Sequence, residues 1–392
     1  MLQTLWLGIF VLAPLWAQSP AAVASVVAGE LATGKYAEVY ARFTPQMRAA
    51  LPEAMVRTLL AQQLFAGAGG FEAVEGESRC QAAQGFDACD VTVRFEGARV
   101  RVLVALDAEN RVGGLRLLGR ELRETAPATL HVSAGAISLP AYLTLPQTTG
   151  PHPLFVLVHG SGPNDADETI GPNKPFRDLA EGLAARGVAT LRYDKRTHVS
   201  SSAPAANFDE EVIDDALAAV KLAQARDGVD PKRVFVLGHS LGGYLAPHIA
   251  SRDAAVRGIV ILAGNNRPMR EILMEQVRHL SGSDTGFEAA WNSLPRHYRE
   301  GLPNYDPLLT ARQLAAPILV LQGARDYQVT TVDYERWKSA LSERRDNEFH
   351  LYPALNHLFL AGAGVSMPAE YNVLSHIPAE VLDDLAAWVK AH

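Results

Sequence analysis

The sequence predicts a doubly wound α/β domain with a mainly parallel sheet, preceded by a small α+β domain. Past residue 150, short apolar runs alternate with helical stretches, which is the order of strands and helices in a doubly wound sheet. Before residue 124, helical segments give way to stretches with an apolar residue at every second position, as in antiparallel strands. The chain has 392 residues, which is enough for two such domains.

The composition is that of an ordinary globular protein. Hydrophobic residues make up 48% of the chain and charged residues 20%, and the formal net charge is −7. This charge provides no basic surface for nucleic acid, so no nucleic-acid partner is expected.

The first residues have the pattern of an export signal. An apolar run from Leu5 to Ala13 is followed by the small residue Ala17, and it is too short to span a bilayer. We interpret residues 1–17 as a signal peptide and expect a secreted or periplasmic protein; the alternative is a buried N-terminal helix. No cysteine lies near the cleavage site and no later segment has transmembrane length, so no membrane anchor is expected.

Residues 18–124 form the predicted α+β domain. Helices are expected within 20–63, and alternating strands at 91–95, 100–106 and 111–118. No acid, base and nucleophile converge here, so we interpret the domain as a packing or dimerisation module through which a homodimer could form.

The two cysteines, Cys80 and Cys89, flank a predicted hairpin turn at Gln84–Phe86. In an exported protein they would form a disulfide across this hairpin. The alternative is two free, half-buried thiols. A metal site would need more ligands than these two.

Residues 128–392 form the predicted doubly wound domain. After an opening antiparallel pair at 130–132 and 137–145, its strands are expected at 154–158, 188–193, 234–237, 258–262, 317–323 and 348–352. Helices lie between them, and a last helix starts at residue 379. The extra stretch 265–314 contains the apolar residues Met269, Ile272, Leu273, Met274, Val277, Trp291, Leu294 and Tyr298. We expect it to form a helical lid over the carboxyl edge of the sheet.

The strand at 234–237 runs directly into Gly238-His-Ser-Leu-Gly242, which fits the pattern G-x-S-x-G. Small residues on both sides allow a sharp turn from strand to helix, with the serine at its apex. Ser240 is therefore the predicted nucleophile. The N–H of Leu241, at the start of the helix, is a predicted oxyanion donor.

A serine needs a base and a group that orients the base. In this topology the acid should follow a late strand and the histidine the last strand. Asp326 follows the strand at 317–323 and His357 follows the strand at 348–352. An acid after the preceding strand would stand at position 265, which is Asn265, so Asp326 is preferred.

The loop after the first parallel strand reads His159-Gly-Ser-Gly-Pro163. We assign the second oxyanion donor to the Ser161 backbone N–H, with Gly160 as the less favoured candidate. We interpret His159 as a brace for this loop rather than as a catalytic base.

These motifs resemble the α/β-hydrolase superfamily, on its esterase and dienelactone-hydrolase-like side. The resemblance rests on residues 159–163, 192–196 (Arg-Tyr-Asp-Lys-Arg), 238–242, 323–326 (Gly-Ala-Arg-Asp) and 356–357 (Asn-His). It implies the hydrolase fold and a Ser240–His357–Asp326 triad that needs no metal or organic cofactor. The serine departs from dienelactone hydrolases, which use a cysteine. The N-terminal domain resembles the cystatin or nuclear-transport-factor-like domain found ahead of some bacterial hydrolases.

Two charged segments are candidates for functional roles. We interpret Tyr193–Arg196 as an ion-paired turn, and Asn164–Glu168 as a solvated loop rather than a cation site.

The sequence therefore predicts a serine hydrolase that cleaves small-molecule carboxylic esters through an acyl-enzyme. The same triad could serve a peptidase, a thioesterase or an acyltransferase. The alternative from a different functional class is a non-catalytic protein of this fold, which would bind a ligand without turning it over.

Overall fold

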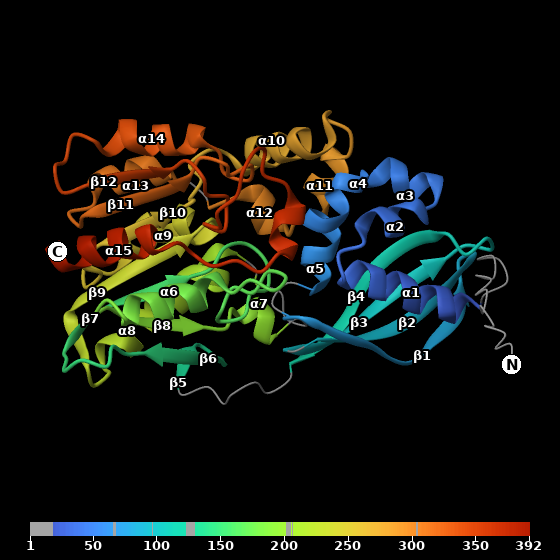
Figure 1. The fold of residues 1–392 in the computed structure, drawn as a ribbon, viewed down its shortest axis with the longest axis horizontal. Helices are drawn as coiled ribbons and strands as arrows, with labels where there is room; N and C mark the ends of the chain where they lie inside the picture. The colour runs from blue at the N-terminus through green and yellow to red at the C-terminus, as the bar shows by residue number, and fades with distance from the viewer. Residues whose placement is uncertain are drawn as a thin grey trace, which may run out of the picture.

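The computed structural model of the protein describes residues 19–65, 68–95, 97–122, 130–200, 205, 207–302 and 305–392. The predicted signal peptide, 1–17, and the predicted domain boundary at 124–128 lie outside these residues. Figure 1 shows the N-terminal domain beside the larger doubly wound domain along the long axis of the molecule. None of the helices in the described ranges has the length and apolarity needed to cross a bilayer.

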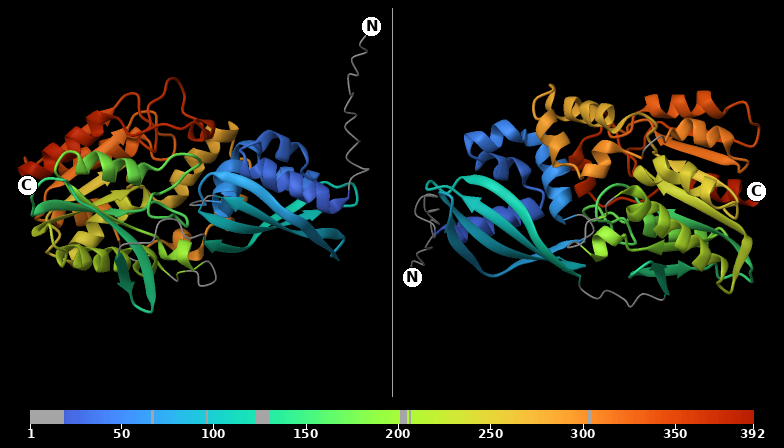
Figure 2. Two further views of the ribbon diagram at one scale, coloured as in Figure 1. Left: turned by 60° about the horizontal axis from the view of Figure 1, so that its bottom comes forward. Right: turned by 180° about the vertical axis from the view of Figure 1, so that it is seen from behind.

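The N-terminal domain is a helix packed on an antiparallel sheet, as predicted. The sheet has the order β1-β2-β3-β4, with β1 at Phe71–Ala83, β2 at Phe86–Phe95, β3 at Ala98–Leu106 and β4 at Val112–Leu122. Buried and more exposed residues alternate along β3, because successive side chains of a strand point to opposite faces. Helix α1 (Pro20–Ala32) lies across the buried face, as Figure 2 shows, and contributes Val23, Val27 and Leu31 to the core.

Short helices complete this domain and reach toward the larger one. They are α2 (Tyr36–Ala41), α3 (Pro45–Ala50), α4 (Glu53–Met55), a π-helical turn (Val56–Ala61) and α5 (Gln62–Phe65). The resemblance to the cystatin or nuclear-transport-factor-like domain stays a prediction, and so does a homodimer through this domain.

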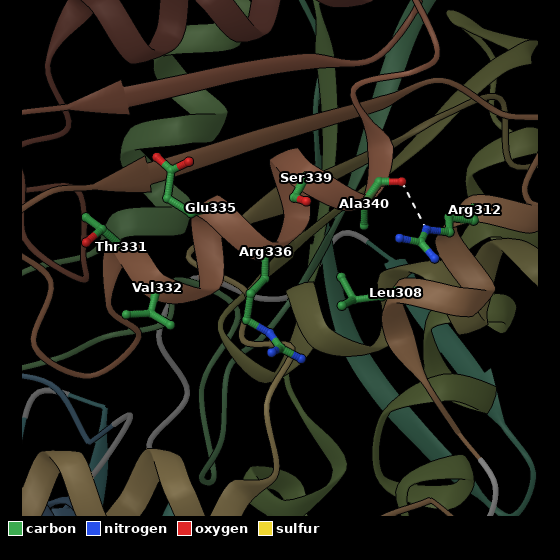
Figure 3. Close-up of a pocket in the computed structure, with 8 residues that line it drawn as sticks. All are labelled: Leu308, Arg312, Thr331, Val332, Glu335, Arg336, Ser339 and Ala340. Atoms are coloured by element: carbon green, nitrogen blue, oxygen red, sulfur yellow. Dashed lines mark hydrogen bonds between the residues drawn. The ribbon is translucent and has the colours of Figure 1, made fainter.

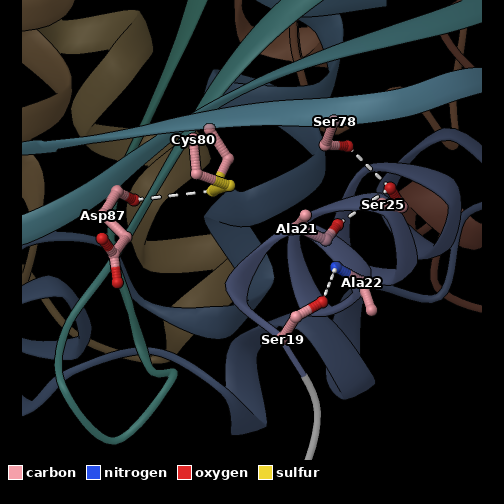
Figure 4. The surroundings of a disulfide bond; sticks show 8 residues. Ser19, Ala21, Ala22, Ser25, Ser78, Cys80 and Asp87 are labelled. Atoms are coloured by element: carbon pink, nitrogen blue, oxygen red, sulfur yellow. Dashed lines mark hydrogen bonds between the residues drawn. A yellow bond between two sulfur atoms is a disulfide. The ribbon is translucent and has the colours of Figure 1, made fainter.

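The predicted disulfide is present. Cys80 on β1 and Cys89 on β2 face each other in register and are bonded, as Figure 4 shows. Gln84 and Gly85 form the turn between the strands with φ angles of 52° and 82°. Such left-handed angles suit a two-residue hairpin turn, and glycine adopts them without strain.

The larger domain contains an eight-stranded sheet in the order β12-β11-β10-β9-β7-β8-β6-β5. Strands β5 (Leu130–Ala134) and β6 (Ile137–Thr144) are antiparallel, and the other six run parallel. These are β7 (His152–Val158), β8 (Ala189–Tyr193), β9 (Val229–His239), β10 (Ile259–Leu262), β11 (Ile318–Gly323) and β12 (Glu348–Tyr352). The predicted fold class is confirmed, and the loops after the parallel strands meet at one edge.

Helices cover both faces of this sheet, which explains why β7 is buried along its whole length. Leu154 and Val156 of β7 pack into one core, and Phe155 and Leu157 into the other. The first core includes α8 (Asp214–Gln224), α9 (Leu241–Arg252) and α14 (Thr331–Leu341). The second includes α6 (Pro175–Ala184) and α15 (Ala379–Ala391).

The insertion at 265–314 is helical, as predicted. It contains α10 (Met269–Ser281), α11 (Phe287–Ser293), α12 (Arg296–Glu300) and α13 (Pro307–Gln313). Met55 of the N-terminal domain is fully buried against Leu273, Val277 and Leu280 of α10. The N-terminal domain therefore covers the apolar face of α10, and Figure 1 shows α4 next to α10 and α11.

Candidate active site

Ser240 lies at the turn between β9 and α9. Its φ and ψ are 54° and −113°, a strained conformation for a residue with a side chain. A Cβ on Gly238 would lie 2.1 Å from the Gly242 carbonyl oxygen, and one on Gly242 would lie 2.2 Å from the Val158 carbonyl oxygen. Both flanking glycines are therefore required by close backbone contacts, and the Ser240 side chain is placed at the carboxyl edge of the sheet.

Asp326 and His357 are in direct contact. His357 Nδ1 lies 2.7 Å from Asp326 Oδ2, and both residues are at most 5% exposed. The other carboxylate oxygen, Asp326 Oδ1, accepts hydrogen bonds from the backbone N–H groups of Gln328 (2.7 Å) and Val329 (3.0 Å). An ionised carboxylate only accepts, so His357 carries its proton on Nδ1 and leaves Nε2 free to act as a base.

His239 connects the Ser240 turn to the His357 loop. Its Nε2 lies 2.9 Å from the His357 carbonyl oxygen, and the two rings are 4.8 Å apart between centroids. Within the described ranges, no hydrogen bond joins Ser240 Oγ to His357. In unliganded hydrolases this bond is often long and tightens only when substrate binds.

The loop after β7 passes directly beside the serine. A Cβ on Gly160 would lie 3.2 Å from Ser240 Cβ. The Gly160 N–H donates a 2.6 Å hydrogen bond to Glu168 Oε1, so this donor is already engaged. This favours the Ser161 N–H, the next along the chain, as the donor from this loop. On the other side of Ser240, Leu241 begins α9, where an N–H has no intrahelical partner.

His159 braces this loop, in agreement with its interpretation from the sequence. Its Nε2 lies 3.0 Å from the Asp165 carbonyl oxygen, and its ring packs between Phe176 and Tyr193. Burial lowers the pKa of His159 to about 4, so the ring is neutral at pH 7.

The interpretation of Asn164–Glu168 as a solvated loop was wrong. Asn164 and Glu168 are 3% and 2% exposed. The segment folds back under the site because its polar groups find partners there: Asn164 Nδ2 donates to the Gly160 carbonyl oxygen, and Glu168 accepts from the Gly160 N–H. These bonds satisfy groups that water would otherwise hydrate.

Glu168 also forms a buried ion pair that sequence reasoning missed. His239 Nδ1 lies 2.9 Å from Glu168 Oε2, a contact without hydrogen-bond alignment. Burial would lower the pKa of His239, but the Glu168 carboxylate, with smaller contributions from the His357 carbonyl and Asp326, raises it. Burial would likewise raise the pKa of Glu168, but His239 and the Gly160 N–H lower it. Each group favours the charged form of the other, and the pair joins the Ser240 turn to the Gly160 loop.

Tyr193–Arg196 is an ion-paired turn, as interpreted, but it also contacts the active-site loop. Arg196 pairs with the buried Asp215, with Nε 2.9 Å from Oδ2. Lys195 bonds to the Gly160 carbonyl oxygen, a contact that the sequence did not indicate. The sequence position of Lys195 could have indicated this contact. Lys195 follows the end of β8 by two residues, which places it at the same edge of the sheet as Ser240.

Within the described ranges, no three His, Cys, Asp or Glu side chains are grouped so as to hold a metal ion. A hollow of about 570 Å³, shown in Figure 3, lies between α13 and α14 and is lined by Leu308, Arg312, Thr331, Val332, Glu335, Arg336, Ser339 and Ala340. None of the predicted site residues lines it.

Three features of this domain define a hydrolase of the α/β class. They are the mainly parallel sheet, the strained serine between a strand and a helix, and the Asp–His pair after the last two strands. A family model described as "Alpha/beta hydrolase family" matches residues 155–372. Esterase EstD of Thermotoga maritima is 38% identical over 331 residues, which cover 78% of this chain and 80% of EstD. The chain belongs to the alpha/beta hydrolase family.

Two solved structures are similar to about two thirds of this chain. Est1E from Butyrivibrio proteoclasticus has a TM-score of 0.47 at 19% identity, covering 67% of this chain and 99% of Est1E. An esterase of Pyrococcus furiosus has a TM-score of 0.49 at 16% identity, covering 67% of this chain and 89% of that one.

Proposed function

We propose that this protein is a carboxylic ester hydrolase that works through an acyl-enzyme on Ser240. The observation that carries the proposal is the 2.7 Å contact between His357 Nδ1 and Asp326 Oδ2, on loops that meet beside the strained serine. The similarity to EstD, a protein named as an esterase, supports an ester as the substrate.

In the proposed reaction, Ser240 Oγ attacks the acyl carbon while His357 Nε2 takes its proton. The backbone N–H groups of Leu241 and Ser161 hold the oxyanion of the tetrahedral intermediate. His357 then gives its proton to the leaving alcohol. In the second half, His357 activates a water that attacks the acyl carbon, and Ser240 leaves. Asp326 keeps the proton on Nδ1 and stabilises the imidazolium.

Secretion or periplasmic export stays part of the proposal. The Cys80–Cys89 disulfide supports it, because disulfides persist mainly in oxidising compartments.

A substrate panel tests the ester preference. We expect turnover of a short p-nitrophenyl ester, with little or none of a peptide p-nitroanilide or an acyl-CoA. p-Nitrophenoxide leaves more readily than an anilide nitrogen, and the similarity to EstD supports an ester as the substrate. Release of p-nitrophenol, p-nitroaniline and thiol would be followed by absorbance, with the Ser240→Ala protein as the background. A peptide or acyl-CoA turned over faster than the ester would contradict the proposal. Binding of the ester without Ser240-dependent turnover would favour the ligand-binding alternative.

A further inference from the structure

Lys195 is a lysine buried beneath the active-site loop. It is 2% exposed and stands between β8 and the short helix α7 (Arg196–Val199). Lysine is almost never fully buried unless its charge has partners. Here Nζ lies 2.9 Å from the Gly160 carbonyl oxygen and 2.7 Å from Glu211 Oε1. Its ammonium group therefore binds one backbone carbonyl and one carboxylate.

The carbonyl that Lys195 binds belongs to a particular peptide unit. The Gly160 carbonyl and the Ser161 N–H are parts of the same peptide group, and this group is trans. In a planar trans peptide the C=O and N–H bonds point in opposite directions. A group that fixes the Gly160 carbonyl therefore also fixes the direction of the Ser161 N–H. A charged donor on the carbonyl also polarises the peptide and strengthens its N–H as a donor.

The peptide groups around Gly160 are held from both sides. The preceding N–H of Gly160 is fixed by Glu168, and Asn164 Nδ2 donates a longer bond, of 3.3 Å, to the same carbonyl as Lys195. Lys195 supplies the only cationic donor to this carbonyl among the described residues. Asn164 and Lys195 therefore hold the same carbonyl, and Lys195 does so through the shorter bond and with a positive charge.

The charge of Lys195 is balanced by Glu211, which is also 2% exposed. Glu211 lies in a π-helical turn (Asp209–Ile213) and accepts hydrogen bonds from His297 Nε2 (2.5 Å) and the Tyr298 hydroxyl (2.7 Å). Burial would raise the pKa of Glu211, but Lys195 and the two α12 side chains lower it to about 2, so it is ionised at neutral pH. The ion pair thus ties the lid helix α12 to the active-site loop.

We propose that Lys195 is a positioning residue for the oxyanion hole, which aims the Ser161 N–H at the developing oxyanion by holding the Gly160 carbonyl. The inference rests on the proposed function, because an oxyanion forms only if Ser240 attacks an acyl group. Lys195 contacts the loop and not the ester, so it acts on the transition state and not on ground-state binding.

The test compares the double variant Lys195→Met/Glu211→Gln with the wild-type protein. Lys195→Met alone leaves Glu211 buried without its cation, which destabilises the fold. The double variant removes both charges and keeps a hydrogen-bonding side chain for His297 and Tyr298. Lys174→Met is the control: Lys174 Nζ lies 3.6 Å from Asp167 Oδ2, and among the described residues no hydrogen bond or ion pair joins Lys174 to Gly160.

We expect kcat for a p-nitrophenyl ester to fall by about 10- to 100-fold in the double variant, somewhat less than the loss on removing an oxyanion donor outright. KM should change by less than about three-fold, since ground-state binding is not affected. A trifluoromethyl ketone, which Ser240 converts into a tetrahedral oxyanion, should bind more weakly by the same factor as kcat falls. The Lys174→Met protein should match the wild type in all three quantities.

Wild-type kcat and wild-type ketone affinity in a folded double variant would overturn the role of Lys195. A fall in kcat with unchanged ketone affinity would overturn it as well, since the loss would then not lie in the oxyanion hole. Thermal unfolding monitored by circular dichroism establishes that the variant is folded. Failure of the proposed function is distinguishable, because the wild-type protein itself would then lack Ser240-dependent turnover.

Discussion

Replacing Ser240 by alanine should lower kcat for a p-nitrophenyl ester on the order of 10⁴-fold or more. The change removes the nucleophile and leaves the oxyanion donors, which alone give only weak catalysis. Alanine fits the same turn, although its φ of 54° is strained for any residue other than glycine. Initial rates at saturating ester measure the effect, after subtraction of hydrolysis in buffer.

Ser251→Ala is the matched control for this change. Ser251 lies near the other end of α9, where its exposed hydroxyl bonds to the His248 carbonyl oxygen. Its replacement should change kcat by less than about two-fold, as is usual for surface sites. Activity of the Ser240→Ala protein within ten-fold of the wild type would mean that another group is the nucleophile.

Replacing Asp326 by asparagine should lower kcat by about 10⁴-fold. The oxygen of the introduced amide would stay on the Gln328 and Val329 N–H groups, which in the wild-type protein hold Oδ1 of Asp326. The amide NH₂ would then face His357 Nδ1, and two donors cannot pair. The ring would move its proton to Nε2, where it can no longer accept the serine proton.

The chain offers a matched control for this substitution too. His350 Nδ1 lies 3.1 Å from Asp384 Oδ2, a second His–Asp contact that is partly exposed and away from Ser240. Asp384→Asn should leave kcat within about two-fold of the wild-type value. Equal losses in the two variants, or full activity of Asp326→Asn, would show that Asp326 does not orient the base.

The main features of the site follow from local sequence, because the parallel sheet brings the ends of its strands together. Gly238 is required by a contact within one strand–turn–helix unit, and Gly242 by a contact with the end of the neighbouring strand β7. Both glycines belong to the pattern G-x-S-x-G, so Ser240 is recognisable without the structure. Asp326 and His357 each follow a strand directly, and this fixes their edge of the sheet. The disulfide follows from its hairpin in the same way.

The supporting residues could not be predicted, because their partners are distant or their environment contradicts their composition. Glu168 stands in an acidic segment that resembles a solvated loop, yet the Gly160 N–H and His239 make its burial favourable. Lys195 is one charge among several in Tyr193–Arg196, and only the fold brings it to Gly160, 35 residues away. The packing of Met55 on α10 of the 265–314 insertion likewise depends on how the two domains meet.

Labelling with a fluorophosphonate probe, followed by mass spectrometry of the modified peptide, determines whether Ser240 is an activated nucleophile. An activated serine attacks the phosphorus only when its base and oxyanion donors are in place. We predict a single adduct on Ser240 in the wild-type protein and none in His357→Ala. The absence of an adduct under conditions that label a control esterase, or equal labelling of His357→Ala, would contradict the claim that Ser240 is activated by His357.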